Sequence, residues 1–226
     1  VSILWPLTLE LSAVEYCSQR SLFMVNFFAT VGAYLLGSLS FAVIVSKAFG
    51  MADPRSYGSG NPGATNVLRS GKKLAAVLTL LGDALKGWLA VWLALRFQAE
   101  LQLDNVTIGL VAVAVLVGHM WPVFFGFKGG KGVATAVGVL LALSWPTALI
   151  CAAVWLVMAF GFKVSSLAAL VATAISPLVA WFFMPHLSWL LAVVVIALLV
   201  LYRHQSNIRN LLSGRESKIG DKAGPE

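Results

Sequence analysis

Long runs of apolar residues alternate along this chain with short polar segments. Seven runs stand out, at about 25–47, 74–97, 105–122, 133–145, 147–162, 166–184 and 188–202. A helix needs roughly 20 apolar residues to cross a bilayer, and the runs lack the period-two alternation of a barrel strand. We therefore expect an all-α integral membrane protein with about seven transmembrane helices. The fourth run is the shortest, and a six-helix arrangement would make it re-entrant.

The overall composition agrees with a membrane protein. Of the 226 residues, 59% are hydrophobic and 11% are charged, whereas a soluble domain is about half apolar and a quarter charged. The net charge of +7 is scattered over short loops, which argues against nucleic-acid binding. Cys17 and Cys151 lie far apart with no Cys/His cluster beside them, so the sequence predicts neither a disulfide framework nor a metal site, and no cofactor.

Three segments are predicted along the chain. Residues 1–23 lack the basic start and clean apolar core of a signal peptide, and Met24 opens directly into the first apolar run. We interpret 1–23 as an N-terminal extension that activity does not require. Residues 24–202 would form the seven-helix membrane domain, and 203–226 a C-terminal motif and tail.

Positive charge gathers on one side of the predicted topology. The loops at 48–73 and 123–132, the turn at Lys163 and the tail beyond residue 202 hold most of the lysines and arginines. With seven spans, all four segments fall on the same side. Because lysine and arginine are enriched in cytoplasmic loops, we place both loops and the tail in the cytoplasm and the N-terminus outside.

The first basic loop contains a glycine-rich segment, Gly58 to Arg69, that suits an anion. Glycine lets the backbone turn its N–H groups inward on a ligand, and arginine binds a phosphate bidentately. The segment adds hydroxyl and amide groups from Ser59, Asn61, Thr65 and Asn66. We predict a phosphate site here; the alternative is a solvated loop before a capped helix.

The second basic loop lies directly before the fourth apolar run. Its glycines and lysines are Lys128, Gly129, Gly130, Lys131 and Gly132, followed by Thr135. A glycine turn that opens a helix presents free N–H groups and the positive end of the helix dipole, which suits a phosphate. The pattern GxxxxGK[ST] is absent, so no nucleotide site follows. We predict a second phosphate site; the alternative is a basic turn that anchors to lipid headgroups.

A third polar cluster follows the last apolar run. His204 and Asn207 are three residues apart and share one face if the helix continues past the bilayer. They would lie on the same side as the two glycine-rich loops, with Glu216 further along the tail. We predict that they join the same site; the alternative is an ordinary interfacial segment. His119, where the third run ends, either fixes that helix end or touches substrate.

One pair of charges lies inside an apolar run. Asp83 and Lys86 are three residues apart in the second run, and a charge within the membrane is costly unless it is paired. We predict a structural ion pair that faces the bundle; a proton or substrate path is the alternative.

These segments resemble one known family. The stretches Gly58 to Arg69, Gly118 to Thr135 and Arg203 to Arg209, followed by Gly214 to Glu216, are similar in sequence and order to motifs of bacterial acyl-phosphate:glycerol-3-phosphate acyltransferases, the PlsY family. The resemblance extends from about Met24 to Lys218. Motifs of other enzyme classes, such as GxSxG, HExxH or an acidic metal cluster, are absent.

The resemblance implies an enzyme of phospholipid synthesis in a bacterial inner membrane. It would transfer a fatty acyl group from acyl phosphate to the 1-hydroxyl of glycerol 3-phosphate and form lysophosphatidic acid. Ser59, His204 and Asn207 would be the catalytic residues, and Glu216 would hold the tail in place. The phosphate groups would be bound by Asn61, Thr65, Asn66, Arg69, Lys128, Gly129, Gly130, Lys131, Gly132 and Thr135. Membrane lipid and the soluble enzyme that makes acyl phosphate would be partners.

Acyl phosphate is a mixed anhydride with a good leaving group, so alignment and electrostatic stabilisation matter more than a strong base. We expect direct attack by the hydroxyl without an acyl-enzyme, the proton passing to a substrate phosphate oxygen while His204 orients or polarises. The rival is a transporter of a small organic phosphate. Against it, the candidate ligand groups all lie on one side, whereas alternating-access sites lie near the midplane.

Overall fold

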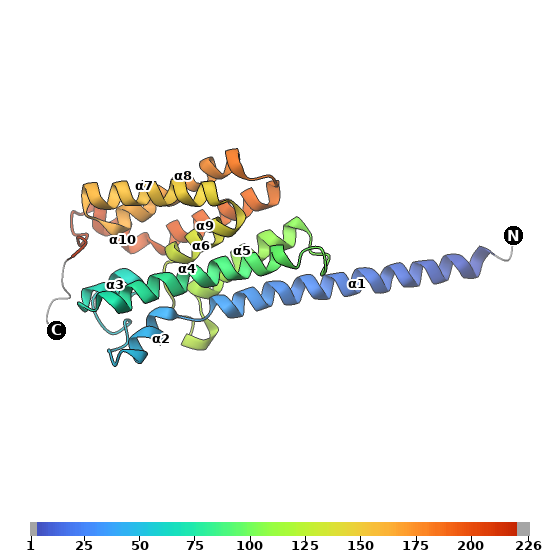
Figure 1. The fold of residues 1–226 in the computed structure, drawn as a ribbon, viewed down its shortest axis with the longest axis horizontal. Helices are drawn as coiled ribbons and strands as arrows, with labels where there is room; N and C mark the ends of the chain where they lie inside the picture. The colour runs from blue at the N-terminus through green and yellow to red at the C-terminus, as the bar shows by residue number, and fades with distance from the viewer. Residues whose placement is uncertain (1–3, 221–226) are drawn as a thin grey trace.

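Helices make up the regular structure of this protein (Figure 1). The computed structural model describes residues 4–220, with side chains from residue 19 onward. Its elements are α1 (Leu4–Gly37), α2 (Phe41–Ala48), α3 (Ala64–Arg69), α4 (Lys73–Arg96), α5 (Asn105–Met120), η1 (Val123–Phe125), α6 (Val133–Leu143), α7 (Trp145–Phe162), α8 (Ser165–Phe183), α9 (Leu187–Arg203) and α10 (Gln205–Leu212). These described residues contain no strand, so the all-α prediction is confirmed.

The helices account for the predicted spans. Within residues 4–220, five segments are long and apolar enough to cross a membrane, namely Gln19–Gly37 of α1, Asn105–Phe125, and helices α4, α7 and α8. Helix α9 joins them when counted with α10, from which it is bent by 57°. The apolar helix α6 has 11 residues. The seven apolar runs therefore correspond to these helices, and the fourth is the shortest, as expected.

The first span differs from its prediction. We expected one helix over 25–47, but α1 ends at Gly37 and α2 begins at Phe41. At this break the carbonyl oxygen of Leu39 accepts a hydrogen bond of 2.6 Å from Lys86 Nζ. An intact helix would use that carbonyl in its own ladder. The buried cation thus stabilises a break that hydropathy alone does not reveal.

Glycines let the central helices touch backbone to backbone. A Cβ on Gly138 of α6 would overlap the carbonyl oxygen of Ala84 in α4, and one on Gly118 of α5 would overlap that of Tyr34 in α1. Small residues are common at helix crossings in lipid, where no hydrophobic effect drives helices together. The contacts fix the register of α1, α4, α5 and α6, which carry the loops described below.

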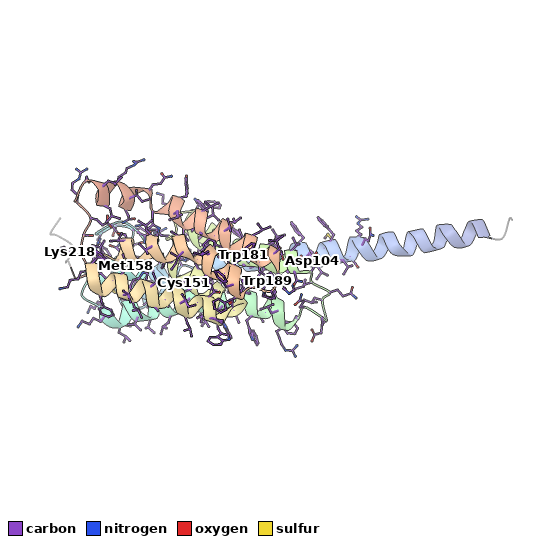
Figure 2. All side chains as sticks on the ribbon, turned by 90° about the horizontal axis from the view of Figure 1, so that it is seen from above. Asp104, Cys151, Met158, Trp181, Trp189 and Lys218 are labelled. Atoms are coloured by element: carbon purple, nitrogen blue, oxygen red, sulfur yellow. The ribbon has the colours of Figure 1, made fainter. Side chains whose placement is uncertain are left out.

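The two ends of the bundle are distinct. In Figure 1, α7 and α8 run along one side, α1 and α2 along the other, and α4, α5 and α6 lie between them. Outward-facing side chains such as Phe160 (79% exposed) and Phe182 (72% exposed) are suited to contact with lipid. Figure 2 shows Asp104 and Lys218 at opposite ends. We call the end with Lys218, which also carries α3 and α10 (Figure 1), the basic end.

The close crossing of α4 and α6 generates a prediction. Gly138→Ala should destabilise the protein by about 1–3 kcal/mol, because the added methyl group has no space. For a chain of this size, each kcal/mol lowers Tm by about 2–4 °C. Thermal unfolding in detergent measures the change. Gly161→Ala in α7 is the matched control, since its Cβ meets nothing within 4 Å; equal Tm values for the two variants would contradict the packing argument.

Candidate active site

The basic end contains a cavity of about 720 Å³. Three segments that are distant in sequence line it: the first basic loop with Ser59 and Asn61, the second with Lys128 and Lys131, and the end of α9 with Arg203. The wall therefore combines hydroxyl and amide groups with several cations. The convergence of the three segments, which the sequence predicts, is present in the structure.

Asn66 organises the first basic loop from behind the cavity. Its side chain is 2% exposed, and its Nδ2 donates to the carbonyl oxygens of Pro54 at 2.6 Å and Tyr57 at 3.1 Å. Its Oδ1 accepts the N–H of Ser59 at 3.0 Å. A Cβ on Gly58, whose φ is +59°, would overlap that same Oδ1. We predicted that the side-chain amide of Asn66 binds phosphate. In the structure it bonds instead to the backbone of its own loop, and it sets the position of Ser59.

Arg55 belongs to the site, although the sequence did not predict it there. Arg55 lines the cavity and holds Asp53 through contacts of 2.6–3.1 Å. Its Nη1 also donates to the carbonyl oxygen of Phe125 at 2.9 Å, which connects the first basic loop to the second. The hydrogen bonds from Arg55 hold the pKa of Asp53 below its ordinary value. The Asp-x-Arg spacing is the signal that could have revealed this pair.

The glycine turn of the second basic loop is bonded within the protein. Gly129 N–H donates to the carbonyl oxygen of Met120, and Gly130 N–H donates to the carbonyl oxygen of His119, both at 3.2 Å. These two N–H groups are therefore not free, contrary to our expectation. What the loop offers the cavity is the pair Lys128 and Lys131, beside the first turn of α6, where helical N–H groups have no partner in the helix.

Arg203 fastens the same turn from the other side. Its Nη2 donates to the carbonyl oxygen of Gly129 at 2.9 Å and its Nε to that of Gly130 at 3.3 Å. Its guanidinium also lies over the Trp121 ring, 5.6 Å from the centroid. A planar guanidinium suits this double contact because its donors point in fixed directions. The sequence showed Arg203 within the third motif but gave it no role.

The third cluster forms a chain of hydrogen bonds to the tail. Lys131 Nζ donates to Asn207 Oδ1 at 2.6 Å. Asn207 Nδ2 donates to Glu216 Oε1 at 2.6 Å, and Ser166 Oγ donates to the same oxygen at 2.7 Å. Burial lowers the pKa of Lys131. Glu216 therefore connects α8 to Asn207, and Asn207 connects the tail to the second basic loop.

His204 follows the last residue of α9. Its ring is 3% exposed, and Nδ1 lies 2.7 Å from the carbonyl oxygen of Val200. Because a carbonyl oxygen only accepts, Nδ1 carries the proton of this bond, and Nε2 is the acceptor nitrogen of the neutral ring. Burial lowers the pKa of His204 to about 4. The ring is therefore neutral at physiological pH.

Other predicted phosphate ligands lie outside the lining of the cavity. Arg69 bonds to the Ser217 hydroxyl, and Thr65 is exposed on α3. Thr135 is fully buried, and its hydroxyl donates to the carbonyl oxygen of Asp83 at 3.0 Å. Gly132, whose φ is +89°, forms the N-cap of α6. These residues shape the loops that surround the cavity, and their direct contact with phosphate stays a prediction.

The intramembrane charges form a buried group of three residues. Lys86 Nζ lies 3.0 Å from Asp83 Oδ1, and their side chains are 1% and 4% exposed. His119 Nδ1 lies 3.4 Å from the same oxygen. The pairing that the spacing of Asp83 and Lys86 predicts is present. The sequence did not reveal that His119, from another helix, joins it.

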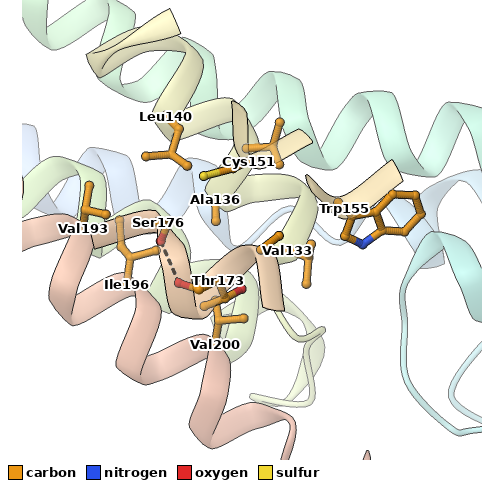
Figure 3. Close-up of a pocket in the computed structure, with 12 residues that line it drawn as sticks. Val133, Ala136, Leu140, Cys151, Trp155, Thr173, Ser176, Val193, Ile196 and Val200 are labelled. Carbon is orange, nitrogen blue, oxygen red and sulfur yellow. Dashed lines mark hydrogen bonds between the residues drawn. The ribbon is translucent and has the colours of Figure 1, made fainter. Parts of the chain in front are cut away.

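A second cavity lies among α6, α7, α8 and α9 (Figure 3). It is lined largely by apolar side chains, including Leu140, Cys151 and Ile196, and Ser176 Oγ donates to the backbone carbonyl oxygen of Thr173, one turn earlier in α8, at 2.9 Å. Its volume is about 40 Å³, roughly the space of one or two water molecules. Its apolar lining distinguishes this cavity from the large cationic cavity at the basic end.

The fold and the larger cavity define a helical, multi-span membrane protein with a cationic pocket at one end. The family model for glycerol-3-phosphate acyltransferase matches residues 27–214. The glycerol-3-phosphate acyltransferases of Neisseria meningitidis serogroup C / serotype 2a and Chromobacterium violaceum are 72% and 61% identical to this chain. The alignments cover 88% and 85% of this chain, and 100% and 94% of the respective relatives.

A solved structure gives the same result. The crystal structure of PlsY, an integral membrane glycerol 3-phosphate acyltransferase in its glycerol 3-phosphate form, matches with a TM-score of 0.79 at 41% identity. The match covers 86% of this chain and 96% of that one. This chain belongs to the glycerol-3-phosphate acyltransferase family, and it is therefore an acyltransferase of lipid biosynthesis.

The double contact of Arg203 generates a second prediction. Arg203→Lys should lower kcat/KM for acyl transfer to glycerol 3-phosphate at least tenfold, because one ammonium group cannot hold both glycine carbonyls in the geometry of the guanidinium. Initial rates in detergent measure the change. Arg209→Lys, on the exposed face of α10, is the control and should keep wild-type rates. Equal rates for Arg203→Lys and wild type would show that the turn holds without Arg203.

Proposed function

We propose that this protein transfers a fatty acyl group from acyl phosphate to the 1-hydroxyl of glycerol 3-phosphate and releases lysophosphatidic acid and inorganic phosphate. The single observation that carries the proposal is the cavity in which Arg55, Lys128, Lys131 and Arg203 converge beside Ser59. Each of the two substrates carries a phosphate group. A cavity with four cations and one carboxylate that is already paired suits two such anions.

The basic end would face the cytoplasm of a bacterial inner membrane, with the N-terminus outside. Lysine and arginine are enriched in cytoplasmic loops, and the basic loops, α10 and the tail all lie at this end. Soluble glycerol 3-phosphate would enter from the cytoplasm. Acyl phosphate would come from the soluble phosphate acyltransferase that makes it, a proposed partner.

The two basic loops would divide the substrates. Glycerol 3-phosphate would bind Lys128 and Lys131 beside the first turn of α6, where the helix dipole favours an anion. The phosphate of the donor would bind Arg55 and the side chains of Ser59 and Asn61. This division supports an alignment of the hydroxyl with the acyl carbon between the loops.

The reaction needs no acyl-enzyme. The 1-hydroxyl oxygen would attack the acyl carbonyl carbon, the bond between that carbon and the phosphate oxygen would break, and the hydroxyl proton would pass to the departing phosphate. The cations neutralise the negative charge, and alignment alone is worth about 7–11 kcal/mol in favourable cases. His204 and Asn207 lie outside the residues that line the cavity, and their place in the mechanism follows from the family resemblance. The neutral ring of His204 would orient the reacting groups through Nε2, together with Asn207.

Purified protein in detergent tests this function directly. Acyl phosphate with glycerol 3-phosphate should yield lysophosphatidic acid and phosphate in equal amounts, whereas acyl-CoA in place of acyl phosphate should yield none. Product from acyl-CoA alone would overturn the proposed donor. No product with either donor, together with uptake of glycerol 3-phosphate into proteoliposomes, would favour a transporter.

A chain that begins at Met24 should be equally active in the same assay, and its inactivity would contradict the proposal that residues 1–23 are dispensable.

His204 allows a further prediction. His204→Gln should lower kcat at least tenfold, because a buried group that orients reactants acts on the chemical step. Turnover near that of wild type would remove His204 from the mechanism. Protonation of the His204 ring at low pH gives a second measurement, because it changes the thermal stability of the protein.

The stability readout has a defined sign. The pKa of His204 is lowered to about 4 in the folded protein, whereas that of an unfolded histidine is about 6.5. His204 therefore contributes stability that is lost as the pH falls from about 6.5 toward 4, about 2 kcal/mol between pH 7 and pH 5. The Tm of wild type should fall over this range by several degrees more than that of His204→Gln. Parallel Tm curves would contradict the assignment.

A further inference from the structure

The imidazole of His119 lies between the buried carboxylate of Asp83 and the glycine turn of the second basic loop. It is 7% exposed, and its Nδ1 lies 3.4 Å from Asp83 Oδ1. Its opposite edge faces Gly130, because a Cβ placed there would overlap Nε2 and lie 2.9 Å from Cε1. The ring thus occupies the space directly beneath the turn, with no room for any side chain at residue 130.

The same position touches the first basic loop. The Cβ direction of Gly130 also points to the carbonyl oxygen of Pro62, at 3.1 Å, and Pro62 lines the large cavity. Gly130 is therefore packed between the His119 ring and the backbone of the first basic loop. A movement of the ring would shift the turn, the spacing of the two basic loops, or both.

Asp83 is itself held on several sides. Lys86 Nζ lies 3.0 Å from its Oδ1 and donates to Leu39 O at 2.6 Å. The Asp83 carbonyl oxygen accepts from Thr135 at 3.0 Å. The carboxylate thus has a fixed place relative to the break after α1 and the first turn of α6. Its negative charge, 3.4 Å from His119 Nδ1, can orient the His119 ring electrostatically.

The buried group is more elaborate than stability requires. An intramembrane ion pair gains little over apolar residues of the same size, and Asp83 with Lys86 already satisfies the charge. His119 adds a third polar group to this interior, and neither its Nδ1 nor Asp83 Oδ1 forms a hydrogen bond of normal geometry. Intramembrane polar groups that stability does not explain are commonly functional.

We infer that His119 is a positioning residue for the glycerol 3-phosphate site: oriented by Asp83, its ring supports the Gly129–Gly130 turn from within while Arg203 fastens the turn from outside. This support fixes the direction in which Lys128, directly before the turn, and Lys131, directly after it, enter the cavity. His119 does not touch the substrate. The inference rests on the proposed function, because it assigns the turn to glycerol 3-phosphate.

The inference predicts a particular kinetic pattern. The phosphate of glycerol 3-phosphate does not change charge during acyl transfer, so its binding contributes equally to the ground state and the transition state. Loss of the support should therefore raise KM for glycerol 3-phosphate, with little change in kcat or in KM for acyl phosphate. A merely structural role would lower Tm and the fraction of active enzyme without altering KM.

His119→Asn and His119→Gln separate the two edges of the ring. Asparagine keeps a polar atom near Nδ1 and loses the edge beneath Gly130, whereas glutamine extends to about the place of Nε2. We expect KM for glycerol 3-phosphate to rise about tenfold in His119→Asn and less than threefold in His119→Gln. His186→Asn, at the opposite end and beside Asn105 at 3.3 Å, is the control and should match wild type. Wild-type KM in a folded His119→Asn variant would overturn the inference.

Asp83 is tested through its coupling to His119. Asp83→Asn alone leaves Lys86 with a weakened partner, so Asp83→Asn with Lys86→Met provides a second background without the buried cation. In either background, adding His119→Asn should raise KM for glycerol 3-phosphate by less than twofold, because the oriented ring is already lost. A full additional tenfold rise in both backgrounds would exclude Asp83 from orienting the ring.

Calorimetric measurement of glycerol 3-phosphate binding tests the role of His119 independently of the proposed acyl transfer. The Kd of glycerol 3-phosphate, measured without acyl phosphate, should rise about tenfold from wild type to His119→Asn. If wild type forms no product but this Kd ratio holds, the proposed acyl transfer is wrong and the proposed role of His119 stands. Product formation by wild type with equal Kd values for the two proteins would overturn the support alone.

Discussion

The buried carboxylate of Asp83 is the point on which the arrangement of the helices depends. Asp83 belongs to α4, its cation Lys86 reaches the break between α1 and α2, and its carbonyl oxygen receives a hydrogen bond from Thr135 of α6. An isolated charge in a bilayer costs several kcal/mol, so its partners must stay in place. The glycine contacts set how closely the helices approach, and the ion pair adds a polar constraint on their alignment. Together they select one register, and that register brings the two basic loops together.

The cavity above this pair carries a different constraint, which is crowding of like charge. Lys131 shares the wall with Arg203. Burial lowers the pKa of Lys131, and the positive charge of Arg203 acts in the same direction against the opposing effect of Glu216. An anion bound among these cations would offset their mutual repulsion. Ligand binding to the folded state should accordingly raise stability. The hydrogen bonds from Lys131 to Asn207 and from Asn207 to Glu216 hold the cluster together.

Sequence patterns could predict the features that depend on local chemistry. Continuous apolar runs identified the helices, and loop composition identified the three segments that meet at the basic end. The break after Gly37 could not be predicted, because its cause is a cation from a helix about fifty residues away. The use of the Gly129 and Gly130 N–H groups was missed for a similar reason. Their acceptors are carbonyls at the end of α5, and nothing in the glycine pattern indicates them.

Asn66 and Arg55 illustrate the same limit at the level of single residues. An amide in a glycine-rich loop is equally suited to a phosphate and to the backbone of that loop, and only the fold decides that Asn66 serves Pro54, Tyr57 and Ser59. Arg55 resembled an ordinary loop charge until its contacts with Asp53 and Phe125 placed it across the two basic loops.

The fate of the proton follows from which negative charges are available. Of the residues that line the large cavity, Asp53 is the one carboxylate, and Arg55 already binds both of its oxygens. His204 is a weak base, because burial lowers its pKa to about 4. A hydroxyl that attacks an acyl phosphate would therefore find its strongest acceptor on the substrate, where the departing phosphate gains basicity as the bond to the acyl carbon breaks. The protein's contribution would then be geometric and electrostatic: it would hold two mutually repelling phosphates at a fixed separation, which dissolved substrates do not maintain.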